Sequence, residues 1–479
     1  MKKNWPAFVI LAAYLVVGTL YAIYTPKWQI PDEPAHYNYI RSLAEGRGFP
    51  VMAQGDYDQD YLSRLTSEKF PPELSVEGLE YEDHQPPLYY LLAVPVYLAF
   101  DGSVKALRLF SLAWGGVAVA MVMLIMREFL PERPGVAWLG VGAVAFIPQF
   151  VAMMAGTNND SLTLALLWLW LWLALRYLRG KTAPWVLGLA LGAMLITKAT
   201  GYGALLLAGM AVSLRHRREG QPFRWAVRQA LFILIPALFL GGLWWLRNVN
   251  VYGWPDVMGQ MQHNEVVIGQ PRTEDWIARD GALPFLTSAL RTTFQSFWGQ
   301  FGWMGVVLDE RIYRGALIFS VLILWGAFWR LREIFKTKLE SRQRDGLLLI
   351  GASAGITLAI FLFYNLTYVQ HQGRYLFPAL PLMALAAAFG LERLTERRLA
   401  IVTALILVVT VAVLGVVGLL RRDMPFWSMA LVGGGAAGLV IATAVPERWR
   451  FLPAAGLIAG LVALDVWCLF GFIVPALAF

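Results

Sequence analysis

Residues 161–178 read SLTLALLWLWLWLALRYL, a largely apolar run with polar residues at both ends. As a helix it would rise by about 27 Å, close to the roughly 30 Å hydrocarbon core of a bilayer. Asn158-Asn159-Asp160 precede the run, and basic residues occupy its other end between Arg176 and Lys181. Since basic residues collect on the cytoplasmic side, the stretch predicts a membrane span whose Asp160 end faces outside.

The composition of the whole chain also indicates a membrane protein. Of the 479 residues, 58% are hydrophobic and 15% are charged, which is more apolar surface than a soluble core of this size can bury. We attribute the net charge of +8 to the asymmetry of the cytoplasmic loops and not to nucleic-acid binding. Cys468 is the single cysteine, which excludes a disulfide within the chain.

Apolar runs long enough to cross a bilayer recur along the chain and predict an all-α integral membrane protein with about thirteen transmembrane helices. The predicted spans are 5–24, 105–126, 135–155, 161–178, 184–197, 200–214, 227–247, 314–331, 347–368, 375–391, 400–420, 427–445 and 451–475. The N-terminus then lies inside and the C-terminus outside. The run 86–100 is apolar but short, so we predict a helix that dips into the outer leaflet without crossing.

Two predicted external loops are long, 25–85 and 248–313. Each is near the lower size limit for independent folding, so we expect helical lids packed on the bundle. Polar residues concentrate before residue 393. We therefore divide the chain into a transmembrane module that carries the chemistry, 1–392, and accessory helices, 393–479.

The first loop opens with two carboxylates and a histidine, Asp32, Glu33 and His36. In a helix starting here, both carboxylates share a face with His36, because they lie four and three residues before it. Such a group can supply a general base or part of a metal site. The structural alternative is that Asp32 caps the helix and Glu33 complements its dipole.

The same loop ends with Glu82-Asp83-His84-Gln85, followed by two prolines and Leu88-Tyr89-Tyr90. Paired prolines favour a helix start, which would hold His84 and Gln85 at the helix mouth while Tyr89 enters the headgroup zone. The alternative is an aromatic belt behind solvated acids.

Charged residues at the outer ends of the predicted spans suggest a place for phosphate. Asp160 lies where a carboxylate is costly unless it is paired, functional or a helix cap. Lys198 lies between two short apolar runs, where an anion such as phosphate is its natural partner. Arg247 and Arg374 border spans at the external face, where a guanidinium suits either phosphate or lipid headgroups.

The predicted topology gathers these residues on one side of the membrane. They are Asp32, Glu33, His36, His84, Asp160, Lys198, Arg247, His371 and Arg374. Separate structural roles would not require this gathering. An external site with acids for activation and cations for phosphate suits chemistry on a sugar carried by a lipid phosphate.

The order of these motifs resembles the GT-C glycosyltransferase superfamily. The matching segments are Asp32–Tyr37, Gln85–Tyr90, Asn159-Asp160, Leu195–Lys198 and Trp245–Asn248. Within the superfamily the chain resembles protein O-mannosyltransferases and lipid A aminoarabinose transferases. The segments Ser296–Trp303 and Gln372–Tyr375 indicate a poorly characterised bacterial branch, and the resemblance covers residues 5–392.

The resemblance implies a multi-pass enzyme of a bacterial or archaeal cytoplasmic membrane that works in the cell envelope. It implies a polyprenyl-phosphate sugar donor, inversion at the anomeric carbon, and an active site facing outside. Asp32, or else Glu33, matches the catalytic carboxylate, and Asp160 matches a second acidic residue. The residues expected to bind the donor are Lys198, Arg247, Arg374, His84, Gln85, Tyr89 and His371.

The chain departs from the aminoarabinose transferases at one position of this pattern. Those enzymes have Glu-Lys before the paired prolines, where this chain has His84-Gln85. A phosphate-binding lysine is therefore absent there, and donor binding must be arranged differently. The resemblance leaves dependence on a divalent metal open, with Asp32, His36 and His84 as candidate ligands.

Two other functions share these requirements: a transporter or flippase of lipid-linked sugars, and a ligase or polymerase that moves whole glycans. Transporters usually contain paired repeats with helices broken near the midplane, and the sequence shows no such symmetry. The clustering of polar residues at one face favours an enzyme. The sugar, and whether the acceptor is a lipid, a glycan or a protein, stay open.

Overall fold

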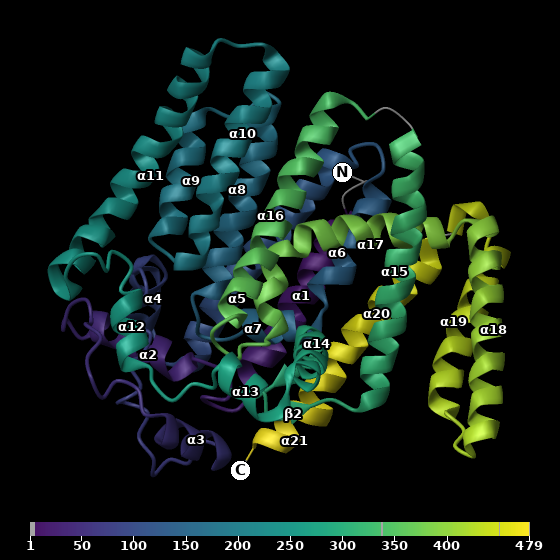
Figure 1. Ribbon diagram of the computed structural model, residues 1–479, viewed down its shortest axis with the longest axis horizontal. Helices are drawn as coiled ribbons and strands as arrows, with labels where there is room; N and C mark the ends of the chain where they lie inside the picture. Colours follow the sequence, from purple (N-terminus) through teal and green to yellow (C-terminus); the bar gives the residue numbers. More distant parts are fainter. Residues whose placement is uncertain (1–4, 337–338, 450, 479) are drawn as a thin grey trace.

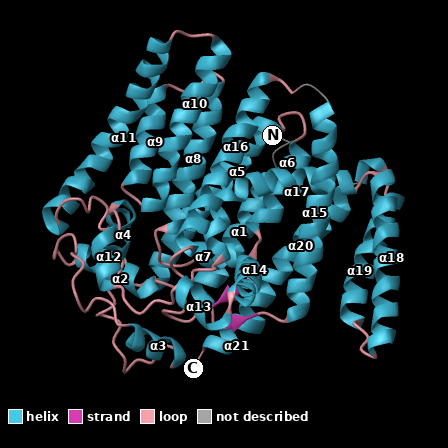
Figure 2. Cartoon of the chain, in the orientation of Figure 1, coloured by secondary structure: helices cyan, strands magenta, loops and turns pink. Residues whose placement is uncertain are grey.

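The computed structural model describes residues 5–336, 339–449 and 451–478. The outer limits predicted for the two modules, residues 1 and 479, lie outside this part of the chain. The fold is a bundle of helices with one short antiparallel pair of strands, in which Gln300 pairs with Val307 and Phe301 with Val306 (Figure 2).

The elements of the first half are α1 (Trp5–Tyr24), α2 (Glu33–Ala44), α3 (Gln59–Ser67), α4 (Leu88–Ala99), α5 (Val104–Phe129), α6 (Pro134–Ala145), α7 (Pro148–Met154), α8 (Asp160–Leu178), α9 (Pro184–Leu195), η1 (Ala199–Tyr202), α10 (Gly203–Glu219) and α11 (Phe223–Tyr252). The second half has α12 (Gln260–Val266), α13 (Thr273–Asp280), α14 (Ala282–Trp298), β1 (Gln300–Phe301), β2 (Val306–Val307), α15 (Glu310–Lys336), α16 (Ser341–Asn365), η2 (Gly373–Ala379), α17 (Leu380–Leu394), α18 (Arg397–Arg421), α19 (Phe426–Ala444), η3 (Glu447–Trp449), α20 (Phe451–Trp467), η4 (Cys468–Ile473) and α21 (Val474–Leu477).

Ten helical segments in the described residues are long and apolar enough to cross a membrane, or eleven if the bent pair α6–α7 forms one span. The all-α fold is as predicted, but the count of about thirteen is not confirmed. The difference lies in two short helices, since α9 has only 12 residues and α10 has 17. Helix α4 also has 12 residues, about 18 Å, which is too short to cross unaided.

The bundle packs around large apolar side chains. In Figure 1, α8, α9, α10 and α11 run alongside one another, and α16 lies next to α8 and α10. Trp168 and Trp170 of α8 are fully buried, together with Phe150 of α7. Helices α18 and α19 pair with each other at the edge of the bundle, whereas α20 returns to pack on α1, α6 and α7.

The two long loops gather at one end of the bundle, where Figure 1 shows α2, α3, α12, α13 and α14 close together. They share a hydrophobic cluster that joins Leu65 and Tyr81 of the first loop to Val266 and Val267 of the second. Most of the cluster comes from the first loop, and the second loop packs onto it through Val266 and Val267. This shared cluster covers the end of the bundle at which the polar residues of the sequence analysis meet.

Candidate functional site

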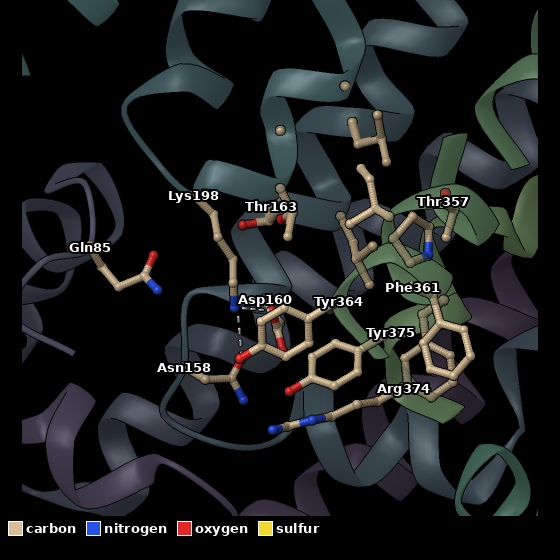
Figure 3. Close-up of a pocket in the computed structure, with 18 of the residues that line it drawn as sticks. Gln85, Asn158, Asp160, Thr163, Lys198, Thr357, Phe361, Tyr364, Arg374 and Tyr375 are labelled. Carbon is tan, nitrogen blue, oxygen red and sulfur yellow. Dashed lines mark hydrogen bonds and ion pairs between the residues drawn. The ribbon is translucent and has the colours of Figure 1, made fainter. Parts of the chain in front are cut away.

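A cavity of about 320 Å³ opens where the two loops meet α8, α10, α16 and η2 (Figure 3). Its polar end is lined by Asp32, His36, Glu82, His84, Gln85, Asn158, Asp160, Lys198, Gln260, His263 and Arg374. Much of the remaining lining is apolar and includes Leu164, Leu167, Leu207, Ile356, Ile360 and Phe361. The cavity thus combines charged groups with a surface suited to hydrocarbon.

Asp32 and Arg374, which are distant in sequence, form an ion pair at the polar end. The Arg374 guanidinium donates to Asp32 Oδ2 at 2.8 Å, and the Tyr81 hydroxyl donates to Asp32 Oδ1 at 3.2 Å. Burial raises the pKa of Asp32, but the surrounding positive charges, that of Arg374 first and that of Lys198 as well, together with the Arg374 hydrogen bond, hold that pKa below its usual value. Asp32 is therefore an ionised carboxylate at neutral pH.

The backbone at Asp32 is in the left-handed conformation, with φ of 66°, and its side chain makes no cap hydrogen bond to α2. Non-glycine residues adopt this conformation at a cost, and such strain concentrates at functional sites. The structural alternative for Asp32, a helix cap, is therefore not what the structure contains. The side chain is directed instead toward Arg374 and the cavity.

Lys198 and Asp160 form the second ion pair. Lys198 Nζ donates to Asp160 Oδ1 at 2.6 Å and to Asn159 Oδ1 at 2.9 Å. Lys198 lies in the short link between the end of α9 at Leu195 and the start of η1 at Ala199. From this link its side chain reaches the N-terminal end of α8, where Asp160 lies (Figure 3). In the same view Arg374 approaches from η2, so two cations from different elements converge.

His36 is another predicted residue of the first loop that lines the cavity. Its Nδ1 lies 2.8 Å from the hydroxyl of Tyr90, and its side chain is buried. Burial, followed by the positive charge of Lys198, lowers the pKa of His36 to about 3. At neutral pH the ring is uncharged, so it contributes hydrogen bonding and not a positive charge.

Glu82 is a cavity residue that the sequence analysis did not select. Its Oε2 is buried without a hydrogen-bond partner among the described residues. Burial, followed by the negative charge of Asp32, raises the pKa of Glu82 to about 8. It is thus the one acid of this end that has no cation as a partner in the part of the chain described here.

Glu33, the second choice for the catalytic carboxylate, lies outside the cavity. Both its oxygens bind Arg108 of α5, at 2.7 and 2.6 Å, and they also accept from the backbone amides of Trp28 and Thr157. Glu33 and Arg108 are both almost fully buried. The acceptor capacity of Glu33 is therefore taken up by the fold.

Three other predicted donor-binding residues do not line the cavity. Arg247 donates to Pro50 O and to the side chains of Asn248 and Tyr252. The hydroxyl of Tyr89 is bound to Ser111, 2.7 Å away. His371 packs against aromatic rings of the second loop, and its Nε2 has no hydrogen-bond partner among the described residues.

The predicted metal candidates Asp32, His36 and His84 all border the cavity but do not converge on one point. Within the described residues, a different trio has ligand atoms within 4.8 Å of one another, namely Asp56, Glu80 and Asp83. His84 instead lies beside His263, with ring centroids 4.4 Å apart. Burial, and then His263, lowers the pKa of His84, so this pair is uncharged at neutral pH.

Several cavity residues were missed although their segments were noticed. Glu82 belongs to the acidic run before the paired prolines, Asn158 to the step before Asp160, and Tyr375 directly follows Arg374. His263 and Tyr364 had no local signal, because they enter from the second loop and from the end of α16. Only tertiary packing places these two beside the others.

The arrangement can bind an amphiphile that carries a phosphate. Arg374 and Lys198 hold two positive charges whose present partners, Asp32 and Asp160, are carboxylates from other elements. A phosphate entering between them would gain charge-assisted hydrogen bonds of the same kind. The apolar lining then offers a place for the adjoining hydrocarbon.

Comparisons with known proteins agree with this description. The family model described as dolichyl-phosphate-mannose-protein mannosyltransferase matches residues 83–245, about a third of the chain. This segment contains the paired prolines, the Asn159-Asp160 step and Lys198. A search of curated proteins finds no match.

Solved structures share the fold across nearly the whole chain. ArnT from Cupriavidus metallidurans bound to undecaprenyl phosphate matches with a TM-score of 0.55 at 16% identity, covering 98% of this chain and 77% of ArnT. The apo state of the same protein gives 0.53 at 16% identity, with 97% and 77% covered. The Archaeoglobus fulgidus oligosaccharyltransferase gives 0.45 at 13% identity, with 95% and 55% covered.

The predicted GT-C fold and the resemblance to mannosyltransferases and ArnT are therefore confirmed. The family match and the fold together indicate a membrane glycosyltransferase of the GT-C type. At this level of identity the ArnT structures establish the arrangement of helices and not the roles of individual residues.

Proposed function

We propose that the protein transfers a sugar from a polyprenyl-phosphate donor to an acceptor, at the cavity that holds Asp32, Asp160, Lys198 and Arg374. The observation that carries the proposal is the presence of two partly buried ion pairs and a largely apolar lining in one cavity. Such a cavity matches a donor with a phosphate and a long hydrocarbon chain. The likeness in fold to ArnT bound to undecaprenyl phosphate supports it.

In the reaction, Asp32 acts as the base. Its carboxylate accepts the proton of the acceptor hydroxyl, whose oxygen attacks the anomeric carbon as the bond to the phosphate oxygen breaks. A single displacement of this kind inverts the anomeric centre. We assign the base to Asp32 and not to Glu33, because Asp32 borders the cavity whereas Glu33 is saturated by Arg108.

Lys198 and Arg374 stabilise the leaving polyprenyl phosphate. Negative charge grows on the phosphate as the sugar departs, and cations already held in place lower the energy of that state. Asp160 and Asn159 fix the Lys198 ammonium through hydrogen bonds of 2.6 and 2.9 Å. His84 and Gln85 border the same cavity and are placed to contact the sugar or the phosphate.

The first experiment is turnover of polyprenyl-phosphate sugars by the purified protein in nanodiscs, read out as release of free polyprenyl phosphate. We expect release by the wild type and none by Asp32→Asn. Asp60→Asn is the matched control, because Asp60 is an exposed carboxylate of the same loop. Full activity of Asp32→Asn would refute the assignment of the base.

The same preparation separates an enzyme from a flippase of lipid-linked sugars. An enzyme releases polyprenyl phosphate in proportion to the sugar transferred, whereas a flippase moves intact donor between leaflets. If wild type and Asp32→Asn move the donor equally, and neither releases polyprenyl phosphate from any donor, the protein is a flippase and not an enzyme.

The proposal places the cavity on the external side of a cytoplasmic membrane. The natural cysteine, Cys468, is buried, so single introduced cysteines can report on topology. We expect a membrane-impermeant maleimide to label Ser63→Cys of the first loop in intact spheroplasts, and to label Arg217→Cys at the end of α10 only after lysis. The reverse pattern would place the site inside.

A further inference from the structure

Three carboxylates of the first loop face one another outside the cavity. Asp56, Glu80 and Asp83 each bring one carboxylate oxygen within 4.8 Å of the other two. The backbone holds them together, because the Glu80 amide donates to Asp56 O and the Asp83 amide donates to Glu80 O, both at 3.1 Å. The cluster therefore joins the segment before α3, which contains Asp56, to the segment before His84, which contains Glu80 and Asp83.

The carboxylate of Asp83 has the environment expected of a metal ligand. Its side chain is only 1% exposed, and its Oδ1 has no hydrogen-bond partner among the described residues. A buried carboxylate costs several kcal/mol unless it is paired, hydrogen-bonded or bound to a cation. Glu80 and Asp56, its nearest carboxylates, add repulsion and not compensation.

The nearby cations are committed to other groups. Arg41 pairs with Glu77, and Arg47 pairs with Glu45. Arg247 is directed to Pro50, Asn248 and Tyr252. Within the described part of the chain, no Lys, Arg or His side chain forms an ion pair with Asp56, Glu80 or Asp83.

We infer that Asp56, Glu80 and Asp83 form a binding site for one hard divalent cation, Ca²⁺ or Mg²⁺. An all-oxygen set with three carboxylates suits these ions, which avoid nitrogen and sulfur ligands. Asp56 and Glu80 are partly exposed, so water completes the coordination from that side. The site is structural, because its carboxylates do not line the cavity.

The bound cation would hold the rim of the cavity in place. Asp83 lies between Glu82 and His84, and both of these neighbours line the cavity. A cation that ties Asp83 to Asp56 therefore fixes the first loop against the mouth of the site. Loss of the cation should loosen the loop without removing any group from the cavity itself.

The test is binding of ⁴⁵Ca²⁺ to the full chain in detergent or nanodiscs after treatment with EDTA, with Mg²⁺ and Mn²⁺ as competitors. We expect one ion per chain for the wild type, at least tenfold weaker affinity for Asp83→Asn, and weakened binding for the partly exposed Glu80→Gln. Glu73→Gln is the matched control, since Glu73 is an exposed carboxylate of the same loop, and it should bind like the wild type.

Limited trypsin digestion gives a second measurement on the same proteins. Arg47 and Arg64 are exposed on the first loop, so Ca²⁺ should slow cleavage there in the wild type and in Glu73→Gln but not in Asp83→Asn. Uptake that is absent from the wild type, or equal in all four proteins, would overturn the site. Neither result bears on glycosyl transfer, so the two proposals fail separately.

Discussion

Asp32 and Glu33 are neighbours in the chain, yet the fold gives them opposite environments. Asp32 borders a cavity and meets one arginine and one tyrosine, so that an entering ligand can still exchange with its partners. Glu33 points into the protein, where Arg108 and two backbone amides occupy both its oxygens. The comparison shows that the surroundings of a carboxylate, and not its presence alone, determine whether its acceptor sites remain open to a ligand.

The same rule applies to the cations. Arg374 and Lys198 border the cavity with one carboxylate partner each. Arg108 donates to Glu33 and to the carbonyl oxygens of Thr25 and Pro26, so it ties α5 to the start of the first loop. The Arg108–Glu33 pair thus holds the loop in place, whereas we propose that Arg374 and Lys198 serve the reaction. Each prediction below tests that division.

The largest expected effect is loss of turnover in Asp32→Asn. Removing a general base typically costs about 10²–10⁴-fold in rate, while an isosteric amide preserves the local packing. Thermal unfolding in detergent should therefore change little compared with the wild type. If Asp32→Asn loses activity only in proportion to its loss of folded protein, the role of Asp32 is structural.

The next largest effect is on stability, at Glu33→Gln. Breaking a buried ion pair by removing one partner costs about 3–5 kcal/mol, because the Arg108 guanidinium is left buried without its counter-charge. We expect a lowered unfolding temperature in detergent. The folded fraction should retain donor turnover, since Glu33 does not line the cavity.

The double variant Glu33→Gln/Arg108→Met is the control for this interpretation. It removes both charges, so it should recover part of the stability that the single change loses. A Glu33→Gln protein that is as stable as the wild type but inactive would move the catalytic role from Asp32 to Glu33.

The sequence foretold one side of this comparison better than the other. Asp160, Lys198 and Arg374, which border the cavity, were selected because charged residues beside membrane spans are costly, and Asp32 because it lies four residues before His36. The pairing of Glu33 with Arg108 carries no such signal, because 75 residues and a change of helix separate them. The predicted count of spans is not confirmed because α9 and α10 have only 12 and 17 residues, and their boundaries could not be fixed from hydropathy alone.

A smaller but more specific effect is expected in the pH dependence of Arg374→Gln. Arg374 holds the pKa of Asp32 below its usual value against the opposing influence of burial. The base form of Asp32 exists above that pKa, so removing the guanidinium should move the acid limb of the pH–rate profile to higher pH. The donor KM should rise as well, because a phosphate contact is lost.

Arg374→Lys is the matched variant, since it keeps the positive charge but loses the fork of donors. Its acid limb should stay near that of the wild type, while its donor KM still rises. If the acid limb does not move in Arg374→Gln, the group that titrates in the pH–rate profile is not Asp32.

The smallest effect is expected at Arg247, whose segment suggested a donor-binding role. Its guanidinium stacks on Trp244 and Tyr252 and donates to Pro50 O and Asn248, so it links α11 to the tip of the first loop. If its role is this link, Arg247→Gln should cost about 1–2 kcal/mol of stability and leave the donor KM nearly unchanged. If Arg247 binds the donor phosphate, the donor KM should rise as much as in Arg374→Gln while stability stays close to that of the wild type. The ratio of the change in donor KM to the change in stability therefore decides whether Arg247 binds the donor, like the cations beside Asp32, or holds the loop, like the partner of Glu33.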